Sequence, residues 1–133
     1  MAESATRLER LLADELGDCC DADVTARRAE LDALADEAFA DDDTRAPFAV
    51  LGNETRYRLA RALAVDGTER CVCELEALVD VSESAVSHAL ADLVDAGLVD
   101  RRKDGNWRYY ESTALANGLF AAAESEDETG AAE

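Results

Sequence analysis

Hydrophobic positions in the first third of the chain follow helical spacing. Leucines at positions 8, 11, 12 and 16 predict an amphipathic helix over residues 4–16 that ends at Gly17. A second helix is predicted from about Thr25 to Phe39, and the acidic run of residues 41–43 is typical of a linker. We therefore expect a helical N-terminal extension over residues 1–44.

The pattern becomes denser from residue 45 onward. Pro47 suits the first turn of a short helix that ends at Gly52, and Asn53 can cap a second helix that ends before Asp66. A third helix is predicted from near Cys71 to residue 79.

The helix that follows has clear start and stop signals. Ser82 is a candidate N-cap whose hydroxyl can accept a hydrogen bond from the Ala85 amide, and the helix runs to Ala96 before Gly97 supplies a left-handed residue. Only residues 80–81 join it to the preceding helix, and two helices joined so closely predict a helix-turn-helix.

The remaining pattern predicts a hairpin and one more helix. Residues 98–103 and 107–111 are rich in strand formers and flank an Asp-Gly-Asn turn signal, which predicts a wing. Ser112 or Thr113 can cap a last helix in front of the acidic tail.

These elements define a fold class. It is mainly α with a small β-hairpin, and residues 45–122 form a winged helix-turn-helix domain. We expect the acidic tail of residues 123–133 to be disordered, because it has few residues that could be buried.

The charge balance by itself counts against nucleic acid as a partner. The chain has 31 acidic and 13 basic residues, a formal net charge of -18, and Lys103 as its single lysine. This composition resembles that of proteins from halophilic organisms, in which molar salt reduces the Debye length to about 3 Å and screens long-range repulsion. Local contacts then decide which partners bind.

Two features bear on the compartment. No apolar run approaches the roughly 20 residues that span a bilayer, so we expect a cytoplasmic protein without membrane contact. The four cysteines form two close pairs, at residues 19 and 20 and at residues 71 and 73. In a reducing cytosol such pairs are expected to be thiols.

A recognition helix offers short polar side chains to base edges, and a wing offers cations to phosphates. The alternatives are a solvated basic turn and a histidine ring that is solvent-exposed or partly packed. The candidate DNA-binding residues are Ser82, Ser84, Ala85, Ser87 and His88 in the helix and Arg101, Arg102, Lys103 and Arg108 in the wing.

Residues 51–110 resemble the ArsR/SmtB family of metal-responsive winged-helix repressors. The resemblance rests on Leu-Gly-Asn-Glu-Thr-Arg at 51–56, Cys-Val-Cys-Glu-Leu at 71–75, Ser-Glu-Ser-Ala-Val-Ser-His at 82–88 and Ala-Gly-Leu-Val at 96–99. It implies a homodimer, with N- and C-terminal helices at the interface, bound to double-stranded operator DNA.

The cysteines are candidates for a sensing site. A position at the start of a helix lowers a thiol pKa and favours the thiolate that binds metal, although two cysteines alone could be small buried hydrophobes. The resemblance implies that Cys71 and Cys73 form the metal-binding motif. Glu76 stands where the arsenite-sensing form has a third cysteine, and Cys19 and Cys20 resemble the arm cysteines of the cadmium- and lead-sensing branch, acting in cis or across the dimer.

The expected effector is a thiophilic ion that releases the repressor from its operator. Arsenite or antimonite suits three thiolates, and cadmium, lead or bismuth are alternatives; a single histidine argues against the family's zinc site. Other interpretations are a thiol redox switch on the same scaffold and a winged-helix protein-interaction module. An enzyme is not expected, because the chain has no Cys-x-x-Cys pattern, phosphate loop or nucleophile-base pair.

Overall fold

The chain divides into two units. The computed structural model describes the backbone of residues 2–16, 21–40 and 42–132 and the side chains of residues 7–15, 22–40 and 43–125. The units are Met1–Asp42 and Asp43–Glu133, which places the boundary two residues before the predicted one. No helix within these described ranges is long and apolar enough to cross a membrane.

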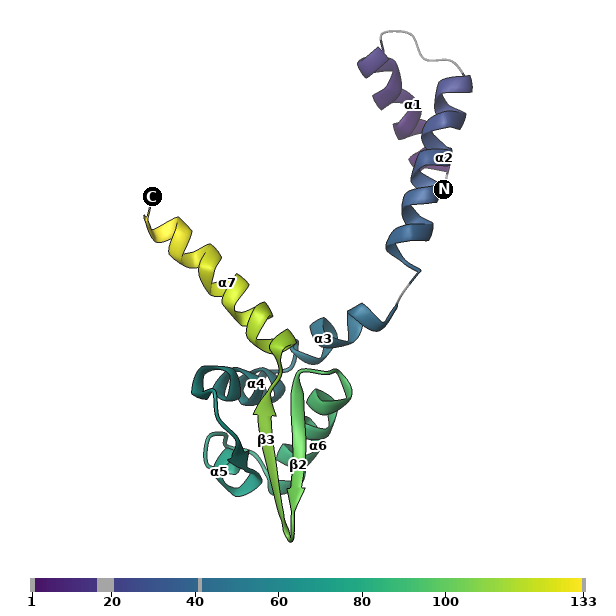
Figure 1. The fold of residues 1–133 in the computed structure, drawn as a ribbon. Coiled ribbons are helices and arrows are strands. Elements are labelled where there is room, and N and C mark those ends of the chain that lie inside the picture. Colours follow the sequence, from purple (N-terminus) through teal and green to yellow (C-terminus); the bar gives the residue numbers. More distant parts are fainter. Residues whose placement is uncertain (1, 17–20, 41, 133) are drawn as a thin grey trace. The chain divides into compact units, whose positions relative to one another are not determined.

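The first unit is a pair of helices, α1 (Ala2–Leu16) and α2 (Asp21–Ala38), which pack on each other (Figure 1). Leu12 is buried between them, and Arg27 of α2 reaches Glu15 of α1 at 3.5 Å. Leu34 and Phe39 remain exposed, because a helical pair has no third layer to cover them. The predicted helices are confirmed, and α2 begins earlier than expected.

The second unit is a winged helix-turn-helix, as predicted (Figure 1). Its three antiparallel strands have the order β1-β3-β2, so the wing hairpin gains a short third strand at the edge of β3. The elements are η1 (Asp42–Thr44), α3 (Arg45–Val50), α4 (Glu54–Asp66), β1 (Arg70–Cys71), α5 (Val72–Glu76), α6 (Glu83–Asp95), β2 (Val99–Asp104), β3 (Trp107–Ser112) and α7 (Ala114–Ala132).

Side-chain caps mark the beginnings of α4, α6 and α7. The Asn53 side chain accepts a hydrogen bond from the Arg56 amide at 3.0 Å, and the Ser82 hydroxyl accepts one from the Ala85 amide at 3.1 Å. Thr113, rather than Ser112, caps α7 by accepting from the Ala116 amide at 3.3 Å. These contacts satisfy amides that have no partner within their own helix.

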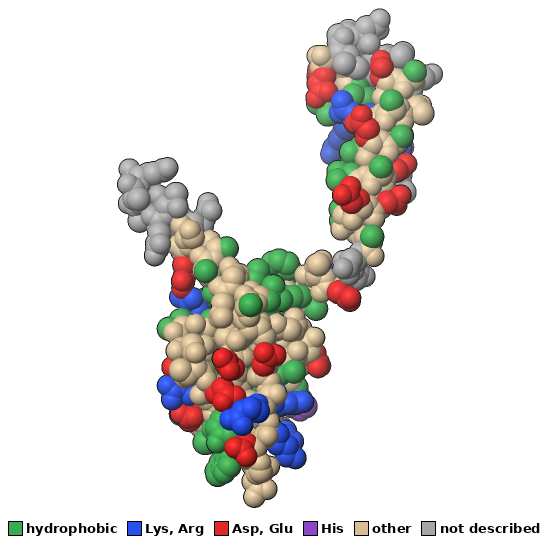
Figure 2. Space-filling model, in the orientation of Figure 1, with side chains coloured by type: hydrophobic (Ala, Val, Ile, Leu, Met, Phe, Trp, Pro, Cys, Tyr) green, Lys and Arg blue, Asp and Glu red, His purple; other side chains and the backbone are tan. Residues whose placement is uncertain are grey.

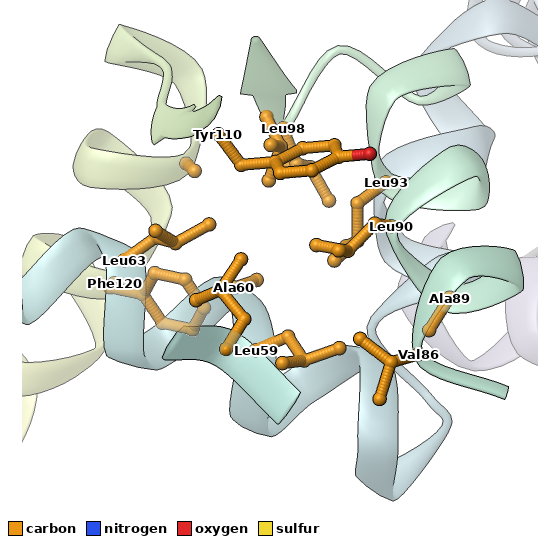
Figure 3. Packing of buried hydrophobic residues seen from close by; sticks show 13 residues of the cluster. Leu59, Ala60, Leu63, Val86, Ala89, Leu90, Leu93, Leu98, Tyr110 and Phe120 are labelled. Carbon is orange, nitrogen blue, oxygen red and sulfur yellow. The ribbon is translucent and has the colours of Figure 1, made fainter. Parts of the chain in front are cut away.

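The core lies between α4, α6 and the sheet (Figure 3). Leucines at residues 59 and 63 of α4 meet those at residues 90 and 93 of α6, and all four are buried. The Tyr110 ring covers this cluster from β3 with its phenol oxygen turned toward α6, while Phe120 closes it from α7. Burial of this face fixes α6 against the hairpin.

Three elements differ from the sequence prediction. Strand β1 was not expected, because a two-residue strand has no pattern of its own. Helix α5 ends at Glu76 instead of residue 79, just after the buried Leu75, and Leu78 beyond this end is exposed. The tail expected to be disordered continues α7 to Ala132, in a segment rich in the strong helix formers alanine and glutamate.

Removal of the α6 cap should destabilise the second unit. Ser82→Ala is expected to lower the free energy of unfolding by about 1 kcal/mol, because the Ala85 amide loses its acceptor. Ser84→Ala, at an equally exposed serine that is not the cap residue, is the matched control and should change it by a few tenths. Urea unfolding in concentrated KCl measures both, and equal effects would contradict the capping role.

Candidate nucleic-acid interface and cysteine site

Helix α6 presents a polar face away from the core. Its buried positions are Val86, Ala89, Leu90 and Leu93. The exposed side chains of the first two turns include Ser84, Ser87 and His88, whereas Ala85 is half-buried and the Ser82 hydroxyl is occupied by the cap. Short polar groups at the amino end of the second helix are the kind of surface that enters a major groove.

The wing divides its charges between two faces. Its register pairs Arg101 with Tyr110 and Lys103 with Arg108, so these three cations lie on the face whose base carries the buried Val99. Within the described residues, none of the three has an ion-pair partner. Figure 2 shows cationic side chains around the hairpin, beside acidic ones.

Arg102 lies on the opposite face of the wing and is already bound to other side chains. Its guanidinium donates to both carboxylate oxygens of Glu69, at 2.8 and 3.0 Å, and its Cζ lies 4.8 Å from the centre of the Tyr109 ring. Asp104 adds a weaker ion pair at 3.7 Å. This environment lowers the pKa of the Glu69 carboxyl, chiefly through the hydrogen bonds from Arg102.

The two cysteines lie at the junction of β1 and α5. Cys71 is buried and pairs with Tyr109 of the wing, while Cys73 is exposed in the first turn of α5. Their sulfur atoms are 3.0 Å apart, with the Cys73 thiol donating. The junction therefore brings two thiols together beside the wing.

An ion-pair network holds this junction. Arg70 donates to Asp66 at the end of α4, at 2.8 and 2.9 Å, and to Glu74 of α5, at 2.8 Å. Glu74 also accepts from the Cys71 amide at 3.0 Å, which caps α5. These bonds lower the pKa of the Asp66 and Glu74 carboxyls and keep both ionised. Buried Leu75 anchors α5 in the core next to α6.

The expected lowering of the thiol pKa is wrong for Cys73. The pKa of this thiol is raised, first by its hydrogen bond to Cys71, then by partial desolvation and by electrostatic interactions with Cys71 and Glu74. The Glu74 backbone amide acts in the opposite direction but is outweighed. A helix of five residues has a weak dipole, so the hydrogen bond to Cys71 and the partial desolvation of the thiol decide the sign.

The pair fits a soft ion as part of a larger donor set. Bonds of about 2.3 Å at a tetrahedral centre place two sulfur atoms about 3.8 Å apart, so the thiols need only a small separation to chelate. No group of three possible ligand side chains occurs among the described residues. Cys19 and Cys20, predicted to complete the site, lie outside the described residues. The described residues thus supply two thiols and no third ligand beside them.

Sequence reasoning missed the residues that support these sites. The spacing of Asp66, Arg70 and Glu74 at intervals of four is a signal for ion pairs and could have revealed the network. No local signal marks the contact of Glu69 with Arg102, because 33 positions separate the two residues.

Removal of the Cys71 sulfur should lower the pKa of the Cys73 thiol toward its ordinary value. In a Cys19→Ser/Cys20→Ser background without metal, Cys71→Ala is expected to move the pH midpoint of iodoacetamide alkylation downward, because the main cause of the shift is gone. Glu83→Gln, which removes a carboxylate from α6, is the control and should leave the midpoint unchanged. An unaltered midpoint in the Cys71 variant would refute the coupling of the two thiols.

Comparisons with known proteins agree with this architecture. Residues 53–101 match the family described as "Bacterial regulatory protein, arsR family". The chain is 48% identical over 122 residues to a Halobacterium salinarum protein named as an arsenical resistance operon repressor, ArsR, in an alignment that covers 90% of this chain and 94% of that protein. It is 40% identical over 63 residues, 47% of this chain and 52% of the other, to the cadmium resistance transcriptional regulatory protein CadC of Listeria innocua.

The fold has the same relatives. The crystal structure of NolR from Sinorhizobium fredii superposes with a TM-score of 0.58 at 25% identity, over 68% of this chain and 89% of that one. The acidic composition agrees with the halophilic source of the ArsR relative. The chain therefore belongs to the ArsR family of bacterial regulatory proteins, which are winged helix-turn-helix transcriptional regulators that bind DNA and are not enzymes.

Proposed function

We propose that the protein is a repressor that leaves its operator when a thiophilic metal or metalloid ion, arsenite or antimonite in the first place, binds cysteine thiolates. Cys71 and Cys73 are the core of the proposed site, and Cys19, Cys20 or both complete it from the same or the partner protomer. The observation that carries the proposal is the pair of thiols 3.0 Å apart at the start of α5.

The position of this pair supports a link to DNA binding. Cys71 belongs to β1, which pairs with the wing, and α5 packs on α6 through the buried Leu75. A separation of the two sulfur atoms displaces β1 or α5, and α6 has to follow because its core face is close-packed. The recognition surface then tilts away from the groove.

The names of the relatives favour the same class of effector. The ArsR relative is named for arsenical resistance and the CadC relative for cadmium resistance. Trivalent arsenic and antimony suit three thiolates, whereas cadmium, lead or bismuth would use four thiolates or a mixed donor set. Arsenite is our first choice because the longer and closer match is to the arsenical repressor.

The proposed DNA surface combines α6 with the cationic face of the wing. Ser84, Ala85, Ser87 and His88 would face base edges, with Ser82 at the helix end, and Arg101, Lys103 and Arg108 would contact phosphates. A homodimer would read two half-sites about 34 to 36 Å apart on double-stranded operator DNA. Exposed Phe48 of α3 and Leu115 of α7 support an interface that includes these helices.

The free energies are sufficient for such a switch. A change in operator occupancy from 99:1 to 1:99 requires an effector that favours the free conformation by roughly 5.5 kcal/mol. Apparent binding free energies at zinc-thiolate sites reach about 10 to 16 kcal/mol. Thiolate coordination can therefore drive release even if much of its free energy is spent on assembling the ligands.

Operator release by metal tests the proposal. The reduced protein, bound to its own upstream DNA in concentrated KCl, is titrated with arsenite, antimonite, cadmium, lead, bismuth and zinc. We expect arsenite to weaken DNA binding by a hundredfold or more, as about 2.7 kcal/mol of coupling would produce. Cys71→Ser and Cys19→Ser/Cys20→Ser should each abolish the response without affecting DNA binding in the absence of metal.

A rescue variant makes the ligand assignment sharper. Glu76 is in α5, three positions after Cys73, so Glu76→Cys places a third thiol on the same side of the helix. In the Cys19→Ser/Cys20→Ser background this variant should restore release by arsenite, while Glu76→Gln in that background should not. Release by an oxidant alone would replace the metal sensor with a redox switch, and a protein that never binds DNA would favour a protein-interaction module.

The cationic face of the wing should determine the salt dependence of binding. Arg101→Gln is expected to lower the slope of log affinity against log KCl by about 0.9 for each phosphate that Arg101 neutralises, or twice that for a dimer. Arg58→Gln, which removes the same charge from α4, is the control and should leave the slope unchanged. If both slopes match that of the wild type, the wing does not contact phosphate through Arg101.

A further inference from the structure

Arg102 is the wing cation whose surroundings differ from those of its neighbours. Its guanidinium makes two hydrogen bonds to Glu69 and lies over the Tyr109 ring. Bidentate arginine-carboxylate pairs are the strongest ion pairs of exposed surfaces and the most directional. A phosphate contact would require Arg102 to break both bonds, whereas Arg101 and Lys103 can meet phosphate without losing a partner.

The alternation of side chains along β2 places Arg102 on the face opposite the one that carries Arg101 and Lys103. On that side the register aligns Arg102 of β2, Tyr109 of β3 and Cys71 of β1 in one row across the sheet. The row begins at a thiol of the proposed sensing site and ends in the wing.

Glu69 closes this row from the chain segment that leads into β1. It lies two residues before Cys71, and its carboxylate reaches across β3 to Arg102 of β2. The backbone ladder between β1 and β3 has only two residue pairs among the described strands. The side-chain contact thus adds a second tie between the cysteine segment and the hairpin.

We propose that Glu69 and Arg102 are positioning residues that hold the wing in its DNA-binding place relative to Cys71 and Cys73 and that transmit a change at the thiols to the wing. Arg102 then acts through the hairpin and not by touching DNA. The transmission of a change at the thiols rests on the proposed function, whereas the positioning of the wing concerns DNA binding in the absence of metal.

The direction in which Glu69→Gln changes DNA affinity shows whether Glu69 positions the wing or competes with phosphate for Arg102. Glu69→Gln removes a negative charge from a protein of net charge -18, so charge alone predicts tighter DNA binding. If Glu69 merely competes with phosphate for Arg102, its removal also tightens binding. If the pair positions the wing, removal of Glu69 weakens binding, because the wing is no longer held in place.

A double-mutant cycle in metal-free protein tests the positioning role. Glu69→Gln and Arg102→Gln should each weaken operator binding by about two- to fivefold, as expected for an exposed ion pair, and the double variant should be no weaker than either single variant. The charge swap Glu69→Arg/Arg102→Glu should restore affinity to within about twofold. The slope against KCl should remain that of the wild type in all four variants.

Two control variants keep the charge changes matched. Glu111→Gln removes a carboxylate from β3 and should leave binding unchanged or slightly tighter, and Arg101→Gln should reduce the KCl slope by about 0.9 per phosphate. A Glu69 variant that binds more tightly, or an Arg102 variant with a reduced slope, would overturn the inference and make Arg102 a DNA contact. Additive losses of affinity in the double variant would overturn it as well.

The same variants test whether Glu69 and Arg102 transmit metal binding at the thiols to the wing. In the wild type, the ratio of operator affinities without and with arsenite measures the coupling, and Glu69→Gln should reduce this ratio by about two- to fivefold while the charge swap restores it. An unchanged ratio in Glu69→Gln would reject transmission through this pair. If the wild type itself shows no release by any metal, the proposed function fails, but the metal-free cycle still decides the positioning role.

Discussion

The position of the thiols depends on two residues of backbone pairing. Arg70 and Cys71 form β1 against the middle strand of the wing, and the chain then turns directly into α5, whose Leu75 is buried beside α6. Cys71 is therefore tied to the hairpin through β1 and, through α5, to the core face of α6. Because Leu75 belongs to the close-packed core, a displacement of the α5 backbone would be felt by α6.

High salt changes which charges matter in such an acidic protein. Where the Debye length is about 3 Å, the repulsion between DNA and distant carboxylates is screened, and only groups in contact interact strongly. The contacts of Arg70 and Arg102 with carboxylates lie at 2.8 to 3.0 Å and belong to this class. The cations left without such a partner on the wing are those on the proposed DNA-facing side. Pairing with carboxylates thus separates the arginines that stabilise the structure from the wing cations that we propose to face DNA.

Short-range signals made the fold predictable, and long-range contacts account for what was missed. Asn53 and Ser82 act on amides three positions away, so their capping follows from the sequence alone. Strand β1 exists only because Cys71 meets Tyr109, and no local pattern of two residues encodes that pairing. The raised pKa of Cys73 likewise depends on where the neighbouring sulfur lies. The identity of the candidate cysteines was predictable, but their surroundings were not.

The unequal burial of the two thiols has a kinetic consequence. Cys73 is exposed while Cys71 is 6% exposed, so a reagent or ion arriving from solvent reaches the outer sulfur first and the inner one only after the pair opens. Capture and retention thereby become separate steps with separate determinants. At the proposed site, the rate of association would reflect the accessible sulfur, whereas the lifetime of the bound state would reflect the sheltered one, which is less accessible to competing thiols.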